Sequence, residues 1–113
     1  MHELGLATEI LDVALAEAAR HQAKRITTIY LQVGVIRAVE HEHLSFMFDH
    51  LSKGTLAEGV KLSIEQMPVQ VECPSCGVIE SAAFAWECPK CKGNEIHIMG
   101  GDALDIVSID IEV

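Results

Sequence analysis

Apolar residues recur at steps of three and four along the first part of the chain, a pattern that predicts an amphipathic helix over residues 4–22. This stripe consists of Leu4, Ala7, Leu11, Ala14, Leu15 and Ala18. A second helix is predicted over residues 41–53, where large apolar side chains again share one face and Gly54 can close the C-terminus. The second stripe consists of Leu44, Met47, Phe48 and Leu51.

Apolar and polar residues alternate in the other segments, which is the pattern of half-buried strands. Residues 27–36 alternate in this way, and so do residues 107–113 at the end of the chain. A further strand begins at residues 60–64, is interrupted by Pro68, and resumes at residues 69–71. Proline has no N–H to donate to a strand ladder, so the interruption predicts a break in the pairing at that point.

The order of these elements predicts an α+β fold, in which two helices pack on a small sheet of about three strands. Residues 1–70 together with 101–113 would form this α+β domain. Residues 71–100 would form a second domain, inserted between two strands that we expect to lie side by side. Short strands at 79–86 and 95–99 would belong to this inserted domain.

All four cysteines of the chain lie in two Cys-Pro-x-Cys motifs, Cys73-Pro74-Ser75-Cys76 and Cys88-Pro89-Lys90-Cys91. Two such pairs can place four thiolates at the corners of a tetrahedron, which is the arrangement that structural Zn²⁺ prefers. Gly77 and Gly93 follow the two pairs, and we expect both to adopt positive φ in tight turns behind the sulfurs. No position is left for water, so the predicted zinc site is closed and structural. The inserted domain is therefore predicted to be a zinc ribbon.

Composition excludes several other classes of protein. The chain carries 17 acidic against 8 basic residues, a formal charge of −9, which disfavours contact with the phosphates of nucleic acids. No apolar stretch approaches the roughly 20 residues that a membrane span needs. Two disulfides or a four-sulfur iron site would use the same cysteines as zinc. The first residues lack the pattern of a secretory signal, however, which favours the cytoplasm and free thiols.

The first residues, Met1-His2-Glu3, offer a second metal site. A free α-amine, the following amide nitrogens and the His2 imidazole can form fused chelate rings, a planar nitrogen-rich geometry that suits Ni²⁺ or Cu²⁺. The N-terminus of a helix repels cations, so an anionic ligand such as Glu3 or a deprotonated amide would be needed. Taken by themselves, the residues favour a solvated His2 that binds no metal.

The whole chain resembles the HypA (HybF) family of nickel-insertion accessory proteins. The resemblance rests on the Met-His-Glu start, the strand end at Gly34, the segment Leu44–Asp49, the Gly54-Thr55-Leu56-Ala57-Glu58-Gly59 motif, the paired Cys motifs, and Leu104 and Ile106 near the terminal strand. It implies a metallochaperone that delivers Ni²⁺ to the large subunit of [NiFe]-hydrogenase. It also implies a GTPase partner of the HypB type and, in some organisms, a role with urease maturation proteins.

The resemblance assigns roles to particular residues. His2 would be the principal nickel ligand, with the Met1 amine and backbone nitrogens, and Glu3 would be a further ligand or a residue that recognises partners. Glu40 lies where some members have a carboxylate close to the nickel. The four cysteines match the zinc ligands, namely Cys73, Cys76, Cys88 and Cys91. Gly5 departs from the family, because many members have Ser there, a better residue for starting a helix.

The remaining histidines are predicted to bind no metal. His41 and His43 are two residues apart and do not face the same way on a helix, so they are interpreted as solvated residues at a helix start. His21 is predicted to lie at the surface near the end of the first helix. His97, in the outgoing strand of the ribbon, could pack near the zinc cluster or respond to pH, but the expectation is that it has no role.

Two other functions compete with nickel delivery. The chain would act as a zinc-ribbon interaction module if it docked proteins without transporting metal, and substitution of His2 separates that alternative from nickel delivery. An enzyme is not expected, because the chain shows no Ser-His-Asp pattern, phosphate loop or open zinc site. All its cysteines are committed to the predicted cage.

Overall fold

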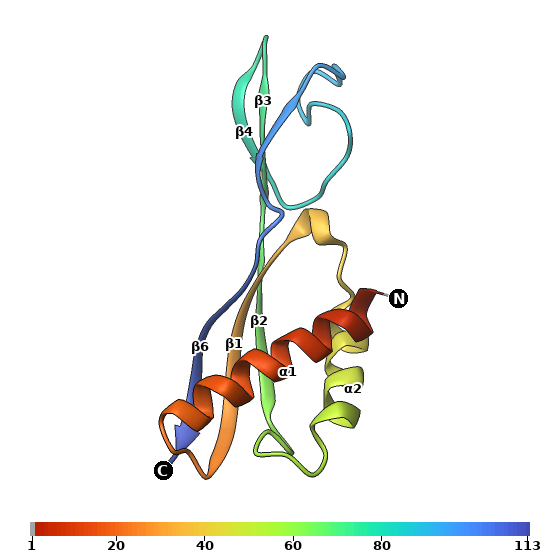
Figure 1. The fold of residues 1–113 in the computed structure, drawn as a ribbon. Coiled ribbons are helices and arrows are strands. Elements are labelled where there is room, and N and C mark those ends of the chain that lie inside the picture. The colour runs from red at the N-terminus through yellow and green to blue at the C-terminus, as the bar shows by residue number, and fades with distance from the viewer. Residues whose placement is uncertain (1) are drawn as a thin grey trace. The chain divides into compact units, whose positions relative to one another are not determined.

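Two helices and two small sheets make up the structure, a computed structural model that describes residues 2–113 (Figure 1). The elements confirm the predicted α+β class. In chain order they are α1 (His2–Arg20), β1 (Arg25–Gly34), a 3-10 turn (Val35–Arg37), α2 (His41–Ser52), β2 (Lys61–Met67), β3 (Val69–Cys73), β4 (Gly77–Ser81), β5 (His97–Gly100) and β6 (Leu104–Glu112).

The first sheet has three strands in the order β2-β1-β6. The prediction that the strands before and after the inserted segment lie side by side is therefore wrong, because β1 separates β2 from β6. β1 is the central strand, and its apolar side chains are fully buried, whereas those of the two edge strands are only partly covered. The buried side chains are Ile26, Ile29, Leu31 and Val33.

The chain divides into two compact units. The first contains residues 1–31, 39–64 and 106–113, and the second contains residues 32–38 and 65–105. In the first unit α1 packs against α2, and both helices contribute to its core. The core side chains from the helices are Ala7, Ile10, Leu11, Ala14, Ala18, Leu44 and Phe48.

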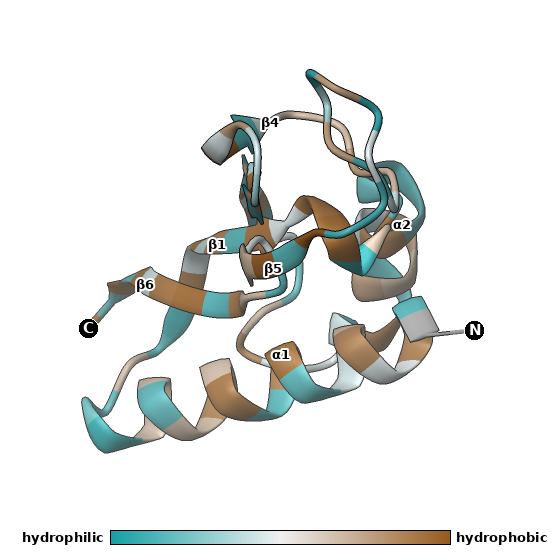
Figure 2. Cartoon of the chain, turned by 90° about the horizontal axis from the view of Figure 1, so that it is seen from above, coloured by the Kyte–Doolittle hydropathy of each residue, from teal (hydrophilic) through white to brown (hydrophobic). Residues whose placement is uncertain are grey.

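The buried stripe of α1 differs slightly from the predicted one. Polar and apolar bands alternate along this helix (Figure 2). Ile10 is buried although it was absent from the predicted stripe, while Leu4 is 43% exposed. An α-helix has 3.6 residues per turn, so the buried face of α1 is centred nearer Ile10 than the predicted stripe was. The helix also begins at His2 instead of residue 4, so Glu3 belongs to its first turn.

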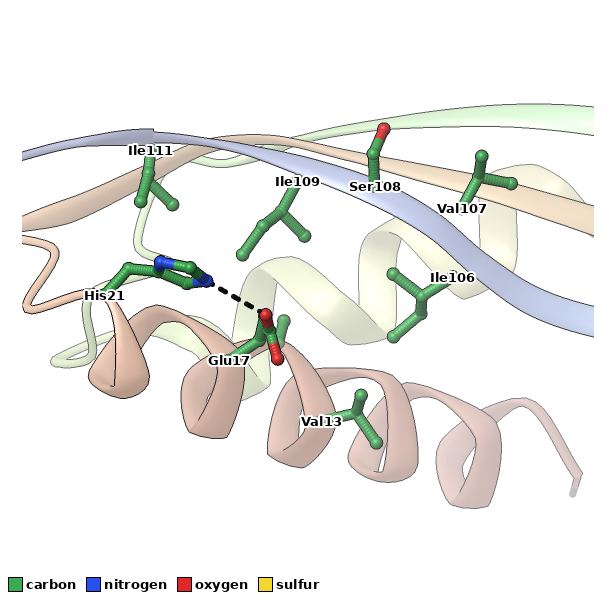
Figure 3. Close-up of a pocket in the computed structure, with 9 residues that line it drawn as sticks. Val13, Glu17, His21, Ile106, Val107, Ser108, Ile109 and Ile111 are labelled. Carbon is green, nitrogen blue, oxygen red and sulfur yellow. Dashed lines mark hydrogen bonds and ion pairs between the residues drawn. The ribbon is translucent and has the colours of Figure 1, made fainter.

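A hollow of about 500 Å³ lies between α1 and β6 (Figure 3). Its walls are mostly apolar, with Val13 from the helix and Ile109 from the strand. At one end His21 Nε2 lies 3.1 Å from Glu17 Oε1, and this hydrogen bond, assisted by Arg20, lowers the pKa of Glu17. His21 is exposed, as predicted, and from the turn just after α1 it pairs with Glu17 of that helix.

β6 keeps the predicted alternation only in part. It begins earlier than predicted, at Leu104, and Ile106 and Ile109 are partly buried. Val107 was expected on the apolar face but is 56% exposed. Val107 and Ser108 are both exposed, so the alternation shifts by one residue between them.

The second sheet has the order β4-β3-β5, and all its strands pair antiparallel. Val69, Val71 and Cys73 of the central strand are buried, while the residues between them are exposed. The first of the two short strands was predicted to reach residue 86 but ends at Ser81. The Ser81 hydroxyl there donates to the carbonyl of Ala83 at 2.8 Å, which turns the chain away from the sheet.

Candidate metal centres

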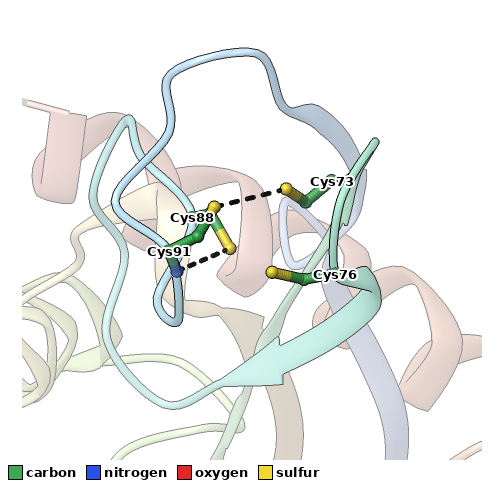
Figure 4. Close-up of side chains that lie close together, drawn as sticks. All are labelled: Cys73, Cys76, Cys88 and Cys91. Carbon is green, nitrogen blue, oxygen red and sulfur yellow. Dashed lines mark hydrogen bonds between the residues drawn. The ribbon is translucent and has the colours of Figure 1, made fainter.

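The four cysteines lie together in the second unit (Figure 4). Their Sγ atoms are all within 4.8 Å of one another, and the Sγ atoms of Cys73 and Cys91 are 3.6 Å apart. Cys73 ends β3 and Cys76 lies in the turn before β4, whereas Cys88 and Cys91 lie on the loop between β4 and β5. Cys73 and Cys88 are buried. Segments separated along the sequence thus bring four thiols to one point.

The turns behind the sulfurs differ from each other. Gly77 adopts positive φ, as predicted. At the second pair the left-handed residue is Lys92, with φ 63°, so the prediction of positive φ for Gly93 is wrong. A Cβ on Gly93 would lie 3.3 Å from Cys91 Sγ. Gly93 is therefore suited to this place because it leaves room beside the sulfur.

The protein groups around Cys88 favour a thiolate. The backbone N–H groups of Cys91 and Lys90 lie 3.5 and 3.4 Å from its Sγ, and they lower the pKa of Cys88 to about 6. The neighbouring thiols have the opposite effect on Cys76, whose pKa is raised to about 12, first by its hydrogen bond with Cys91. One thiolate forms readily, and a cation is needed to stabilise four. The closed, all-sulfur donor set fits a structural Zn²⁺ ion.

Zinc affinity is expected to fall as the pH falls. Zinc binds thiolates, so Cys76, with its raised pKa, must release a proton at every pH near neutrality. Cys88 carries no proton well above its pKa of about 6 but must also release one below it. A plot of zinc affinity against pH, from competition with a chelator, should therefore rise with pH and be steeper below about pH 6. An affinity that does not change with pH would contradict thiolate ligation.

The predicted nickel site is described only in part. Met1 and the side chain of His2 lie outside the described part of the chain. Glu3 follows in the first turn of α1, and its side chain is buried, with the residue only 8% exposed. Glu40 immediately precedes α2 and has an exposed side chain, while its carbonyl accepts a hydrogen bond from Leu44 N at 2.9 Å.

His43 is the residue whose surroundings differ most from the prediction. Its Nδ1 lies 3.9 Å from Oε1 of Glu3, and its side chain is only 35% exposed. His43 lies at the start of a helix, as predicted, but its side chain is partly covered and contacts Glu3 instead of being fully solvated. No local signal in the sequence could have revealed this contact, because it depends on how α1 and α2 pack.

The other histidines have separate surroundings. His97 is exposed on β5, where it pairs in register with Glu72 of β3. The ring of His50 makes an edge-to-face contact with Phe46 at 4.7 Å. Neither histidine belongs to a group of potential metal ligands; among the described residues only the cysteines form one.

Fold and site together define a small α+β protein that carries a closed four-cysteine module suited to zinc. The family model described as "Hydrogenase/urease nickel incorporation, metallochaperone, hypA" matches residues 1–111. The chain therefore belongs to the HypA family, the nickel metallochaperones of hydrogenase maturation. No helix over residues 2–113 combines the length and apolar character that a membrane crossing requires.

Individual relatives agree with this assignment. The chain is 34% identical to hydrogenase maturation factor HybF of Salmonella typhimurium, over 99% of this chain and 100% of the relative. It is 35% identical to hydrogenase maturation factor HypA of Escherichia coli K12, with coverage of 99% and 98%. The fold is shared with the solution structure of the Ni metallochaperone HypA from Helicobacter pylori, at a TM-score of 0.66 and 20% identity over 97% of each chain.

Proposed function

We propose that this member of the family binds Ni²⁺ at Met1-His2-Glu3 and delivers it to the large subunit of [NiFe]-hydrogenase. The observation that carries the proposal is the family match over residues 1–111, which includes these three residues. A HypB-type GTPase is the proposed partner in this transfer, which would take place in the cytoplasm. The protein would bind and release the ion without catalysing a reaction.

The start of α1 suits a site built from backbone nitrogens. The helix begins at His2, and the first four N–H groups of a helix have no acceptor within it. Those amides can therefore lose a proton and bind nickel without breaking a helical hydrogen bond. The partial positive charge of the helix end opposes a cation, and the nearby carboxylate of Glu3 would offset that charge.

We assign zinc to Cys73, Cys76, Cys88 and Cys91, whose clustered thiols support this role. The zinc would hold residues 71–100 as a ribbon domain. Residues 1–70 and 101–113 would form the nickel-binding domain, and Glu40 is a further candidate for the surroundings of the nickel ion. With nickel as cargo and zinc as a resident ion, the two metals would have separate tasks.

A nickel titration of zinc-loaded protein tests the proposal, with d–d absorption recorded beside metal content. The native chain should take up about one nickel ion with the spectrum of a planar site. Replacement of His2 by Ala should abolish this uptake, and so should one extra residue before Met1, because each change removes a ligand. Equal binding by all three proteins, or binding by none, would contradict the proposal and favour a zinc-ribbon interaction module.

A further inference from the structure

We propose that His43 is a positioning residue of the N-terminal nickel site and acts through Glu3. This inference rests on the proposed function, because it assumes that nickel binds at Met1-His2-Glu3. It adds a residue from a different helix to a site otherwise formed by the first residues of the chain.

The burial of Glu3 is unusual for an acidic residue. Glu3 is 8% exposed and is the single buried acidic residue within 2–113, whereas the other acidic residues there are partly or fully exposed. A carboxylate removed from water is costly unless charged or hydrogen-bonding groups compensate it. The position of Glu3 is therefore set by its neighbours, and His43 Nδ1, at 3.9 Å from Oε1, is one of them.

Glu3 and His43 lie on two different helices, each near its start. Glu3 lies in the first turn of α1, and His43 lies in the first turn of α2. The two helices pack against each other within one compact unit, and both bury apolar side chains, Ala7 on α1 and Leu44 on α2 among them. His43 is thus held on a rigid element and can fix a side chain at the start of the other helix.

The contact between His43 and Glu3 also affects the proposed nickel ligands. The amide nitrogen of Glu3 and the residue before it belong to the proposed chelate, so anchoring the Glu3 side chain also limits the motion of the ligating backbone. A preorganised chelate loses less conformational entropy on binding the ion. The Glu3 carboxylate is also kept close to the helix end, where its negative charge favours a cation.

His43→Leu should therefore weaken nickel binding by about tenfold, which is the lower end of the effect of removing a group that orients a metal ligand. The d–d band should keep its position, because the ligands themselves are unchanged. His43→Gln keeps a polar N–H group that can reach the carboxylate, and it should restore most of the affinity. His41→Leu is the matched control, since His41 lies in the same helical turn and lines a different hollow with Phe46 and Ile64.

A double-mutant cycle with Glu3→Gln separates this role from a general effect on the fold. If His43 acts through Glu3, His43→Leu should cause no further loss in the Glu3→Gln background. Equal losses in both backgrounds, or unchanged affinity in His43→Leu, would overturn the proposal. So would a shifted d–d band in His43→Leu, because it would make His43 a ligand itself.

Two controls keep the outcomes distinct. Circular dichroism and zinc content show whether each variant is folded. If His43→Leu is not folded, the nickel affinity of His43→Gln is measured in its place. Absence of nickel binding in the native chain would refute the proposed function. Native binding that His2→Ala abolishes, while His43→Leu binds as the native chain does, would refute the positioning role of His43 alone.

Discussion

Removal of zinc should unfold the cysteine-bearing segment and leave the helical unit folded. Within residues 77–100, all of which the structure describes, only Cys88 is fully buried, so this segment has no apolar core of its own. Each ordered residue loses about 1–2 kcal/mol of backbone entropy, which burial of so few side chains cannot offset. Zinc binding contributes about 10–16 kcal/mol in comparable small modules. The metal is therefore expected to supply most of the stability of this segment.

Hydrogen exchange and fluorescence measure this effect separately in the two units. After chelation, or in Cys88→Ser, the amides of β4 and β5 should exchange freely while those of α1 and α2 remain protected. Trp86, the single tryptophan, reports on the segment through its edge-to-face contact with Phe84. Ser75→Ala, an exposed change within the first Cys motif, should behave as the native chain. Continued protection of β5 without metal would show that the module folds on its own.

Gly34→Ala should lower the stability of the protein by about 3 kcal/mol, or roughly 10 °C in melting temperature. A Cβ on Gly34 would lie 2.0 Å from the carbonyl oxygen of Gly101 and 2.7 Å from the nitrogen of Asp102. These are backbone atoms, and they cannot turn aside as a flexible side chain can. The same backbone accepts a hydrogen bond from Ile36 N at 3.0 Å, so a shift would also disturb this bond.

Gly5→Ala is the matched control for this substitution. A Cβ on Gly5 meets no atom within 4 Å, and Gly5 lies in the first turns of α1. Alanine there should raise stability by about 0.5–1 kcal/mol, because glycine loses more backbone entropy in a helix. Thermal unfolding of both variants tests the pair. If Gly34→Ala were as stable as the native chain, the close approach of Gly34 to Gly101 would be wrong.

Local patterns predicted most elements because each pattern reflects the geometry of a single element. The steps of three and four residues placed α1 and α2, and the alternation around Ile29 placed β1. The ends of the elements were predicted less accurately. The strand predicted over 79–86 stops at Ser81, because the Ser81 hydroxyl bonds to the backbone and turns the chain, and the alternation of apolar residues carries no sign of this bond. Strand order was not accessible either, because the burial of β1 between two edges depends on all the strands together.

The four-cysteine cluster, the two helices and the family of the chain could all be predicted from local features of the sequence. Cysteine spacing is local chemistry, and four thiols so arranged have few alternatives to a metal. The contact of His43 with Glu3 could not be predicted, since forty residues of chain separate them and the packing of α1 on α2 brings them together. The close approach of Gly34 to Gly101 could not be predicted either, because a contact between two backbone segments produces no repeating pattern of residues in the sequence.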